Sequence, residues 1–289
     1  MRKRKNGFSI VEILTVMSII VILIGLIVPS LNKARRYSLE IVQKVQLKGI
    51  GTSLELFNAE NQGYPPSSFS GGDSAYCGAM KLGEAMVGKD FKGYNPKSNF
   101  RGGDTEFYAE DITTATSPHK LNLDGRRSYM ELSESSAVKV GDLYDDLSGA
   151  YDFDPCEVVL TDKYSHPSKT GNRGMPILYY KADTSGSIHP NPGENTNFDL
   201  TQANYIDSRN HYDYEDNDWF VDIDPFHDNL PTSPIDLTDR WNRASIFYKN
   251  TWDPDITIND GVPHNSSRFI LLSAGYDGIF FTKDDIYNF

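Results

Sequence analysis

The first apolar run of the chain is long enough to cross a membrane. Residues 8–28 read FSIVEILTVMSIIVILIGLIV, in which Glu12 is the only charged side chain. A helix of about 20 apolar residues spans the hydrocarbon core of a bilayer. The run is not followed by the small-x-small pattern that signal peptidase cuts, so we expect it to stay attached as a transmembrane segment. A plain membrane anchor is the simplest interpretation of this run taken alone.

The helix is expected to continue past Pro29 with one apolar face. Turn-forming residues at 61–66, NQGYPP, end the pattern, so a helix is predicted over residues 8–62. Polar side chains, Gln43 among them, separate apolar positions that recur at near-helical spacing and are expected to pack on a sheet: Ile41, Val45, Ile50, Leu54 and Phe57.

The remainder of the chain, residues 63–289, is predicted to form a globular head of α+β class. Its segments 67–156 and 184–242 are rich in Gly, Pro, Ser, Asn and Asp, which predicts large loop insertions. The long N-terminal helix would then pack on a small antiparallel sheet. Four β-rich runs are expected to supply the strands: 157–161, 177–181, 245–248 and 269–273.

Charge along the chain predicts the orientation in the membrane. The basic residues Arg2, Lys3, Arg4 and Lys5 precede the apolar run, and positively charged flanks stay on the cytoplasmic side. The remaining residues would then lie outside the cytoplasm. The formal net charge of −12 argues against a nucleic-acid partner, because a phosphate backbone repels an acidic surface.

A carboxylate within a membrane helix is costly and is usually kept for a function. The segment Lys5-Asn6-Gly7-Phe8-Ser9-Ile10-Val11-Glu12 resembles the N-terminal signal of type IV pilins and type II secretion pseudopilins, in which a short basic leader ends in Gly before an apolar helix. The resemblance implies that a prepilin peptidase cuts between Gly7 and Phe8, leaving a leader of residues 1–7. It also implies N-methylation of Phe8, an assembly role for Glu12 and a helix kink at Pro29.

A physical argument supports the assembly role. Cleavage would create an α-amino cation at Phe8, and four helical steps of about 1.5 Å place Glu12 roughly 6 Å along the axis from it. A neighbouring subunit displaced by a similar distance would bring its amine to this carboxylate. Two charges that are costly in an apolar filament core would then neutralise each other and set the register of the subunits.

The carboxyl end resembles the calcium-binding loop of major pseudopilins. Residues 273–286, SAGYDGIFFTKDDI, contain a GxDG turn and later aspartates, although Tyr276 and Phe281 stand where small residues or proline are usual. The resemblance implies a calcium ion held by Asp277, Asp284 and Asp285 with backbone carbonyls near Leu272 and Ser273. Calcium prefers six to eight hard oxygen ligands, which such a loop provides. A metal-free Asp-Gly turn is the alternative.

A second acidic stretch, between Asp213 and Asp228, interleaves carboxylates with aromatic residues. It lacks the order and central glycine of an EF-hand, so a solvated acidic loop is favoured over a calcium site. The two cysteines, Cys77 and Cys156, are candidates for one disulfide in an oxidising compartment, and two unrelated buried thiols are the alternative.

No catalytic constellation is found in the sequence. Residues 83–89 have the GxxxxGK spacing of a phosphate loop, but Asp90 follows where Ser or Thr is required, and residues 79–87 predict a short amphipathic helix ending at Gly88. The six histidines never occur at HExxH spacing, and no GxSxG is present. We therefore expect no enzymatic activity.

The resemblance implies a structural subunit of a pilus-like filament, most similar to a major-type pseudopilin of type II secretion. A type IV pilin of a surface pilus, or a membrane-anchored binding domain that borrows the leader, are the alternatives. Pilins usually close a C-terminal disulfide loop, and neither cysteine lies in that part of this chain. The implied partners are a prepilin peptidase and methyltransferase, further copies, minor pseudopilins and an inner-membrane assembly platform. The implied location is the inner membrane, with a single pass and the head in the periplasm.

Overall fold

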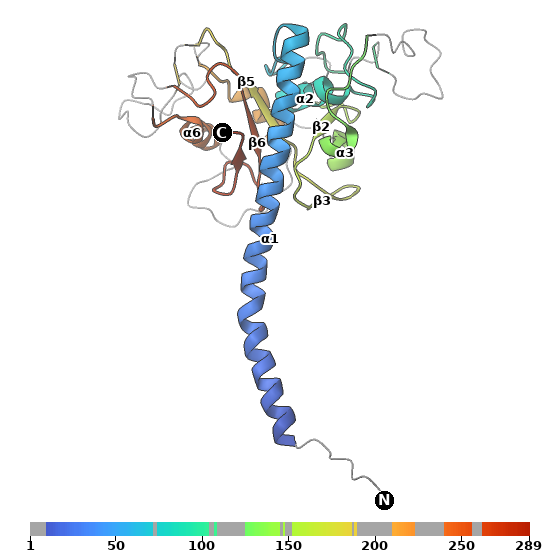
Figure 1. Cartoon of the computed structure of the whole chain (residues 1–289). Helices are drawn as coiled ribbons and strands as arrows, with labels where there is room; N and C mark the ends of the chain where they lie inside the picture. Colours follow the sequence, from blue (N-terminus) through green and yellow to red (C-terminus); the bar gives the residue numbers. More distant parts are fainter. Residues whose placement is uncertain are drawn as a thin grey trace, which may run out of the picture. The chain divides into compact units, whose positions relative to one another are not determined.

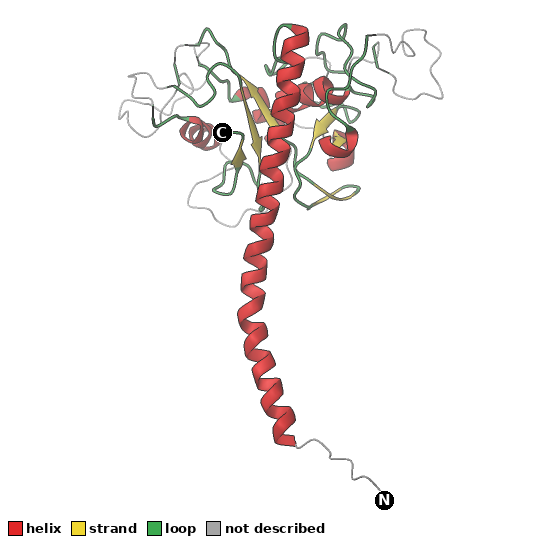
Figure 2. Cartoon of the chain, in the orientation of Figure 1, coloured by secondary structure: helices red, strands yellow, loops and turns green. Residues whose placement is uncertain are grey.

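The chain divides into two units, Met1–Ile41 and Val42–Phe289, whose boundary falls within the first helix. The computed structural model describes residues 10–71, 74–103, 107–108, 125–144, 147, 152–186, 188–189, 210–222, 240–255 and 262–289. The second unit contains both helices and strands (Figures 1 and 2).

Helix α1, Ile10–Asn61, confirms the long N-terminal helix (Figure 1). It passes through Pro29 without interruption and ends before Gln62, which has a positive φ of 58°. Proline lacks the N–H that would bond one turn back, yet the helix is long enough on both sides to continue through it. The kink predicted at Pro29 stays a prediction. The large apolar side chains between Ile10 and Leu31 are exposed.

The part of α1 within the second unit buries a different face from the one predicted. Ile50, Leu54 and Phe57 are buried as expected. The burial predicted for Ile41 and Val45 is wrong, because 46% and 65% of their surfaces are exposed. The full buried set is Gln43, Gln46, Leu47, Ile50, Leu54 and Phe57.

Two glutamines take the place expected for apolar residues because backbone groups face them. The Gln43 Oε1 accepts from the Lys163 N–H at 2.8 Å, and the Gln46 Nε2 donates to the Thr161 carbonyl at 2.8 Å. Backbone N–H and C=O groups just beyond the end of a strand lack a partner in the sheet. When they are buried, they need a side-chain partner instead. An apolar pattern alone does not reveal this requirement.

The α+β class is confirmed by three small antiparallel sheets among the described residues. Strands β5 (Leu178–Lys181), β6 (Phe269–Ser273) and β7 (Ile286–Tyr287) form the largest, in that order, with Tyr179 opposite Leu271. Figure 1 labels β5 and β6. Strand β1 (Ala137–Lys139) pairs with β2 (Val158–Leu160), and β3 (His166–Ser168) pairs with β4 (Gly171–Arg173). Three of the four predicted strand runs are therefore correct.

The fourth predicted strand, residues 245–248, is wrong. It lies within helix α6, Arg240–Thr251. The buried positions Ala244, Phe247, Tyr248 and Thr251 follow the i, i+3, i+4, i+7 spacing of a helix face. A window of four residues that favour β-strands was too short to show the helical period.

Helix α2, Gly78–Val87, is the centre of the second unit and shows that part of the predicted insertion 67–156 is core. Its position and its end at Gly88 were predicted, but it is buried on every side rather than amphipathic. Glycines allow its backbone to approach two strands: a Cβ on Gly78 would lie 2.3 Å from the Tyr179 carbonyl, and one on Gly83 would lie 2.1 Å from the Val158 carbonyl. The helix thus joins β5 to β2. Two short helices follow in the same segment, α3 (Leu132–Ser135) and α4 (Val140–Leu143).

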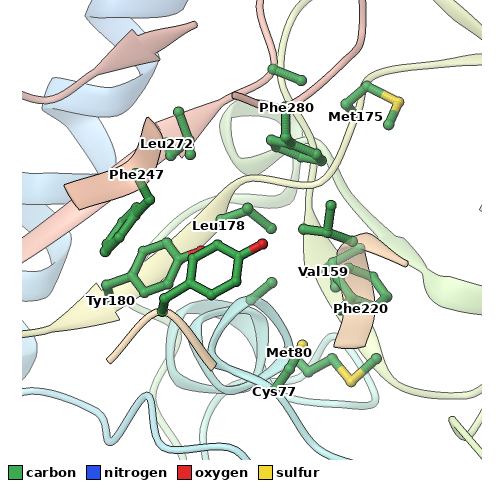
Figure 3. Close-up of a cluster of buried hydrophobic side chains, with 14 of the residues drawn as sticks. Cys77, Met80, Val159, Met175, Leu178, Tyr180, Phe220, Phe247, Leu272 and Phe280 are labelled. Atoms are coloured by element: carbon green, nitrogen blue, oxygen red, sulfur yellow. The ribbon is translucent and has the colours of Figure 1, made fainter. Parts of the chain in front are cut away.

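The core collects side chains from segments far apart in the sequence. The rings of Tyr180 and Phe247 lie 4.6 Å apart between β5 and α6, and Phe220 comes from helix α5, Glu215–Val221 (Figure 3). The described part of the predicted insertion 184–242 therefore also contributes to the core. Other members shown in Figure 3 are Cys77, Met80, Val159, Met175, Leu178, Leu272 and Phe280.

The part of the acidic stretch that forms helix α5 is not a solvated loop. Asp216 and Asp218 are buried, and Arg243 of α6 lies 3.0 Å from an Asp218 oxygen while its Nε donates to the Tyr214 hydroxyl at 3.0 Å. Arg240 approaches the second Asp218 oxygen at 2.9 Å. A buried carboxylate needs such partners, because its desolvation is otherwise uncompensated.

We predict that Arg243→Met lowers the free energy of unfolding by about 3 kcal/mol or more, since Asp218 would lose a buried partner. Arg268→Ala is the matched control: its pair with Glu55 is exposed, with 62% and 43% of the two side chains accessible. It should cost less than about 1 kcal/mol. Denaturant unfolding of the detergent-solubilised chain, followed by fluorescence of the three tryptophans, all in the second unit, measures both. Equal losses in the two variants would contradict this account of α5.

Candidate functional site

The N-terminal end of α1 carries the residues predicted for processing and assembly. Gly7 and Phe8 lie outside the described residues, so cleavage between them and methylation of Phe8 stay predictions. Helix α1 begins at Ile10, and Glu12 lies in its first turn with an exposed side chain. The helix dipole favours a carboxylate at this end.

The hydroxyl side chains near Glu12 are satisfied within the helix. The Thr15 hydroxyl lies 3.0 Å from the Val11 carbonyl and 2.9 Å from the Glu12 carbonyl, and Ser18 donates to the Thr15 carbonyl at 2.8 Å. Glu12 is the only ionisable side chain from residue 10 to residue 32. The helix is long and apolar enough to cross a membrane by its length and composition. An apolar surface of this extent needs either lipid or other helices against it.

The predicted calcium loop lies between β6 and β7 and brings two carboxylates together. The Asp277 N–H donates to an Asp284 oxygen at 2.9 Å. The Thr282 hydroxyl lies 2.6 Å from the other Asp284 oxygen and 3.1 Å from Asp277. One hydroxyl proton cannot satisfy both carboxylates at once. The turn depends on Gly275 and Gly278, whose φ angles are 72° and 74°.

The two carboxylates share their titration. Burial, together with the neighbouring Asp284, raises the pKa of Asp277 to about 6. Burial acts in the same direction on Asp284, but donation from the Thr282 hydroxyl and the Asp277 N–H outweighs it and lowers the pKa of Asp284. A proton taken up by the pair therefore resides on Asp277. A cation at this position would favour ionisation of both.

Asp285 points to different partners. One of its oxygens accepts from the Phe281 N–H at 2.8 Å, and its other oxygen, Oδ1, is buried without a hydrogen-bond partner. Burial raises the pKa of this carboxyl. Across the residues that the structure describes, no three His, Cys, Asp or Glu side chains are grouped closely enough to hold a metal ion. Asp277 and Asp284 thus fit a pair of hard oxygen ligands, while Asp285 does not join them.

The other two predicted calcium residues have structural partners of their own. Leu272 pairs with Tyr287 across β6 and β7. The Ser273 hydroxyl donates to Asp162 at 3.0 Å. That the backbone carbonyls near Leu272 and Ser273 bind calcium stays a prediction.

Two residues that the sequence reasoning missed hold this loop in place. Asp162 accepts from Ser273 and from the Tyr164 and Met175 N–H groups at 3.1 and 3.0 Å, and its burial raises its pKa to about 7. The His166 ring packs so closely on Gly278 that a Cβ there would lie 2.7 Å from Nδ1. Burial lowers the pKa of His166. The sequence offered one signal for these two residues, namely that Asp162 directly follows the predicted strand 157–161.

The disulfide considered between Cys77 and Cys156 is not formed. Cys77 is buried at the start of α2, whereas Cys156 is exposed. Burial raises the pKa of the Cys77 thiol to about 12, so it stays protonated as part of the core. The alternative of two unrelated buried thiols holds for Cys77, but Cys156 is exposed.

The phosphate-loop spacing at residues 83–89 belongs to α2 and its end. The Lys89 ammonium lies 2.7 Å from a Glu157 oxygen and 2.7 Å from the Arg101 carbonyl, and Gly83 packs on the backbone of β2. The lysine is therefore engaged within the protein. This geometry agrees with the rejection of a nucleotide site.

Comparison with known protein families finds a match on the N-terminal segment. A family model described as the prokaryotic N-terminal methylation motif matches residues 2–28. The search of curated proteins and the search of solved structures each found no match. The match covers the basic leader, the Gly7-Phe8 junction, Glu12 and the apolar first part of α1. The chain therefore carries the prepilin-type N-terminal signal of type IV pilin-like proteins, which implies processing by a prepilin peptidase and assembly into a filament.

Proposed function

We propose that this chain is a structural subunit of a pilus-like filament, of the major pseudopilin type that serves protein export in type II secretion. The observation that carries the proposal is the methylation motif at residues 2–28, continuous with an exposed apolar helix. The pilin-like family with this motif is structural rather than enzymatic. A surface pilus is the second candidate, because the same motif serves both.

The proposed mechanism begins with membrane insertion of α1. The peptidase acts from the cytoplasmic face, where the basic leader holds the N-terminus, and the amine of Phe8 is then methylated. In the filament the apolar surfaces of α1 from several copies cover one another. The Phe8 amine of one copy meets the Glu12 carboxylate of another, so each charge that is costly in an apolar core gains its counter-charge.

The proposed partners follow from this mechanism. They are the prepilin peptidase and methyltransferase, further copies of the chain, minor pseudopilins and an inner-membrane assembly platform. The proposed location is the inner membrane with the second unit in the periplasm. Deletion of the gene would distinguish the two functions: loss of exported proteins with intact surface pili favours secretion, and the reverse favours a pilus.

We predict that the mature chain begins with methylated Phe8. Intact-mass analysis of membrane-extracted protein, from a host with an active prepilin peptidase, should show the loss of residues 1–7 and the gain of one methyl group. We expect Gly7→Leu to block the cut, because it replaces the glycine that ends the leader in the prepilin-type signal. Gly25→Ala is the control, since no atom lies within 4 Å of a Cβ added there. A wild-type chain that keeps Met1 would refute the proposal.

We predict that Glu12→Gln leaves insertion and cleavage intact but lowers filament yield about ten-fold or more, because the neutral amide no longer pairs with the Phe8 amine. Removing the charge eases membrane retention, so the mature protein should accumulate in the membrane. Ser18→Ala is the matched control, since its hydroxyl bonds only within its own helix. Sheared-filament immunoblots measure the yield. A normal yield from Glu12→Gln would exclude the pairing.

We further propose that the loop between β6 and β7 binds calcium through Asp277 and Asp284 with backbone carbonyls. The support is the pair of carboxylates that share one hydroxyl donor, together with the resemblance of the segment to the pseudopilin loop. Such a pair repels itself when both members ionise, and a divalent cation relieves this repulsion.

We predict that calcium raises the melting temperature of the detergent-solubilised chain. At a free concentration about 100 times the dissociation constant, binding adds roughly 2.7 kcal/mol to stability. Asp277→Asn should abolish the shift. Asp183→Asn is the control, since this exposed aspartate bonds Ser185 outside the loop. Identical melting in calcium and in chelator, with no heat of binding by calorimetry, would exclude the site.

A further inference from the structure

A groove of about 640 Å³ runs within the second unit between α1 and the C-terminal sheet. One wall is the α1 segment from Lys44 to Glu55, and the other is formed by the start of β6 and the residues around β7. The polar and small lining residues include Lys44, Lys48, Gly51, Thr52, Glu55 and Arg268.

The floor of the groove is apolar and closely packed. Leu47 and Phe269 are buried, and the Phe269 ring lies 3.7 Å from the position of a Cβ on Gly51. The Tyr64 ring packs edge-on against Phe269 with centroids 5.2 Å apart. Because Gly51 has no side chain, the helix leaves space above this ring. The groove is therefore built by the fold and does not depend on a side chain moving aside.

The walls carry an excess of positive charge. Lys44 and Lys48 are one helical turn apart on α1, and Arg268 faces them from the opposite wall. Among the residues that line the groove, Glu55 is the only acidic side chain. It is already engaged, since it accepts from the Tyr64 hydroxyl at 2.9 Å and lies 3.5 Å from Arg268. The lining thus carries three basic side chains and one acidic side chain, and the acidic one already pairs with Arg268.

This local charge is opposite to that of the whole chain. The chain carries a formal net charge of −12, and loss of the four basic leader residues would take it to −16. Copies packed side by side in a filament would repel one another unless their contacts place opposite charges together. Screening limits such interactions to about 8 Å at physiological salt, so the pairing has to be made at the contact itself.

We propose that this groove is a contact surface between copies of the chain, and that it receives an acidic segment of the neighbouring subunit. The inference rests on the proposed filament function. Lys48 and Arg268 pair with carboxylates of the neighbour, while the floor formed by Leu47 and Phe269 excludes water beneath them. An anionic peptide of another protein would fit the same chemistry, but the strongly acidic surface present at highest local concentration in a filament is a second copy.

The contact is tested in the full chain in its native host by a photo-cross-linking amino acid at Thr52. This residue lines the groove and is exposed, and its hydroxyl bonds only the Lys48 carbonyl of its own helix. Irradiation of cells should give a covalent dimer of the chain. Mass spectrometry should place the cross-link on a peptide rich in Asp and Glu.

The charge requirement is tested by Lys48→Glu combined with Arg268→Glu. Dimer yield should fall about ten-fold, as expected when two charge pairs at a contact become repulsive. Lys97→Glu with Arg173→Glu is the matched control, since both residues are exposed and neither lines the groove. Both double variants should melt within a few degrees of the parent, so that loss of folding does not explain the result.

The outcomes separate this inference from the function on which it rests. Dimers that disappear in the groove variant and persist in the control variant support the contact. Processed, filament-forming parent chains that cross-link only to another protein, or whose dimers survive in the groove variant, overturn the inference and leave the proposed function standing. A parent chain that is neither processed nor assembled overturns both.

Discussion

One continuous helix has to meet two different environments, and this constraint governs the rest of the chain. Between Ile10 and Leu31 the large apolar side chains of α1 are exposed around the helix, so that segment gains stability only from lipid or from other helices. Between Gln43 and Phe57 the same helix buries one face in the second unit. The change from apolar on all sides to buried on one side explains why the sequence shows two hydrophobic patterns within a single helix.

The elements with strong local patterns could be predicted, and those that depend on distant partners could not. The long helix, α2 and three strand runs follow from period and turn residues in short windows. The strand expected at residues 245–248 failed because the helical period of α6 appears only over Ala244 to Thr251. Gln43 was expected outside because nothing in α1 announces the Lys163 N–H that it accepts from. The acidic run was expected in solvent because its cations, Arg240 and Arg243, follow it in another helix.

The same division applies to the candidate site. The N-terminal signal is recognisable because Gly7, Phe8 and Glu12 lie in one short segment, and the matching family model covers that segment. The C-terminal loop was identified in part: Asp277 and Asp284 meet as expected, but Asp285 is drawn aside by the Phe281 N–H. Asp162 and the groove above Phe269 arise only when separate segments fold together, so no local motif points to them.

The two charged contacts proposed for the filament differ in their surroundings, and this difference gives them different tasks. Glu12 lies in an apolar segment, where a missing counter-charge is costly and screening by salt is weak. Such a contact fixes register, because the wrong axial position leaves a charge uncompensated. Lys48 and Arg268 lie at a solvent-accessible groove, where ion pairs are individually weak and salt screens them. Contacts of that kind add little affinity but discriminate between orientations, since a surface of the wrong charge is repelled. The Glu12 contact within the apolar core would then set the axial position of each copy. The groove contact would set the rotation of its second unit.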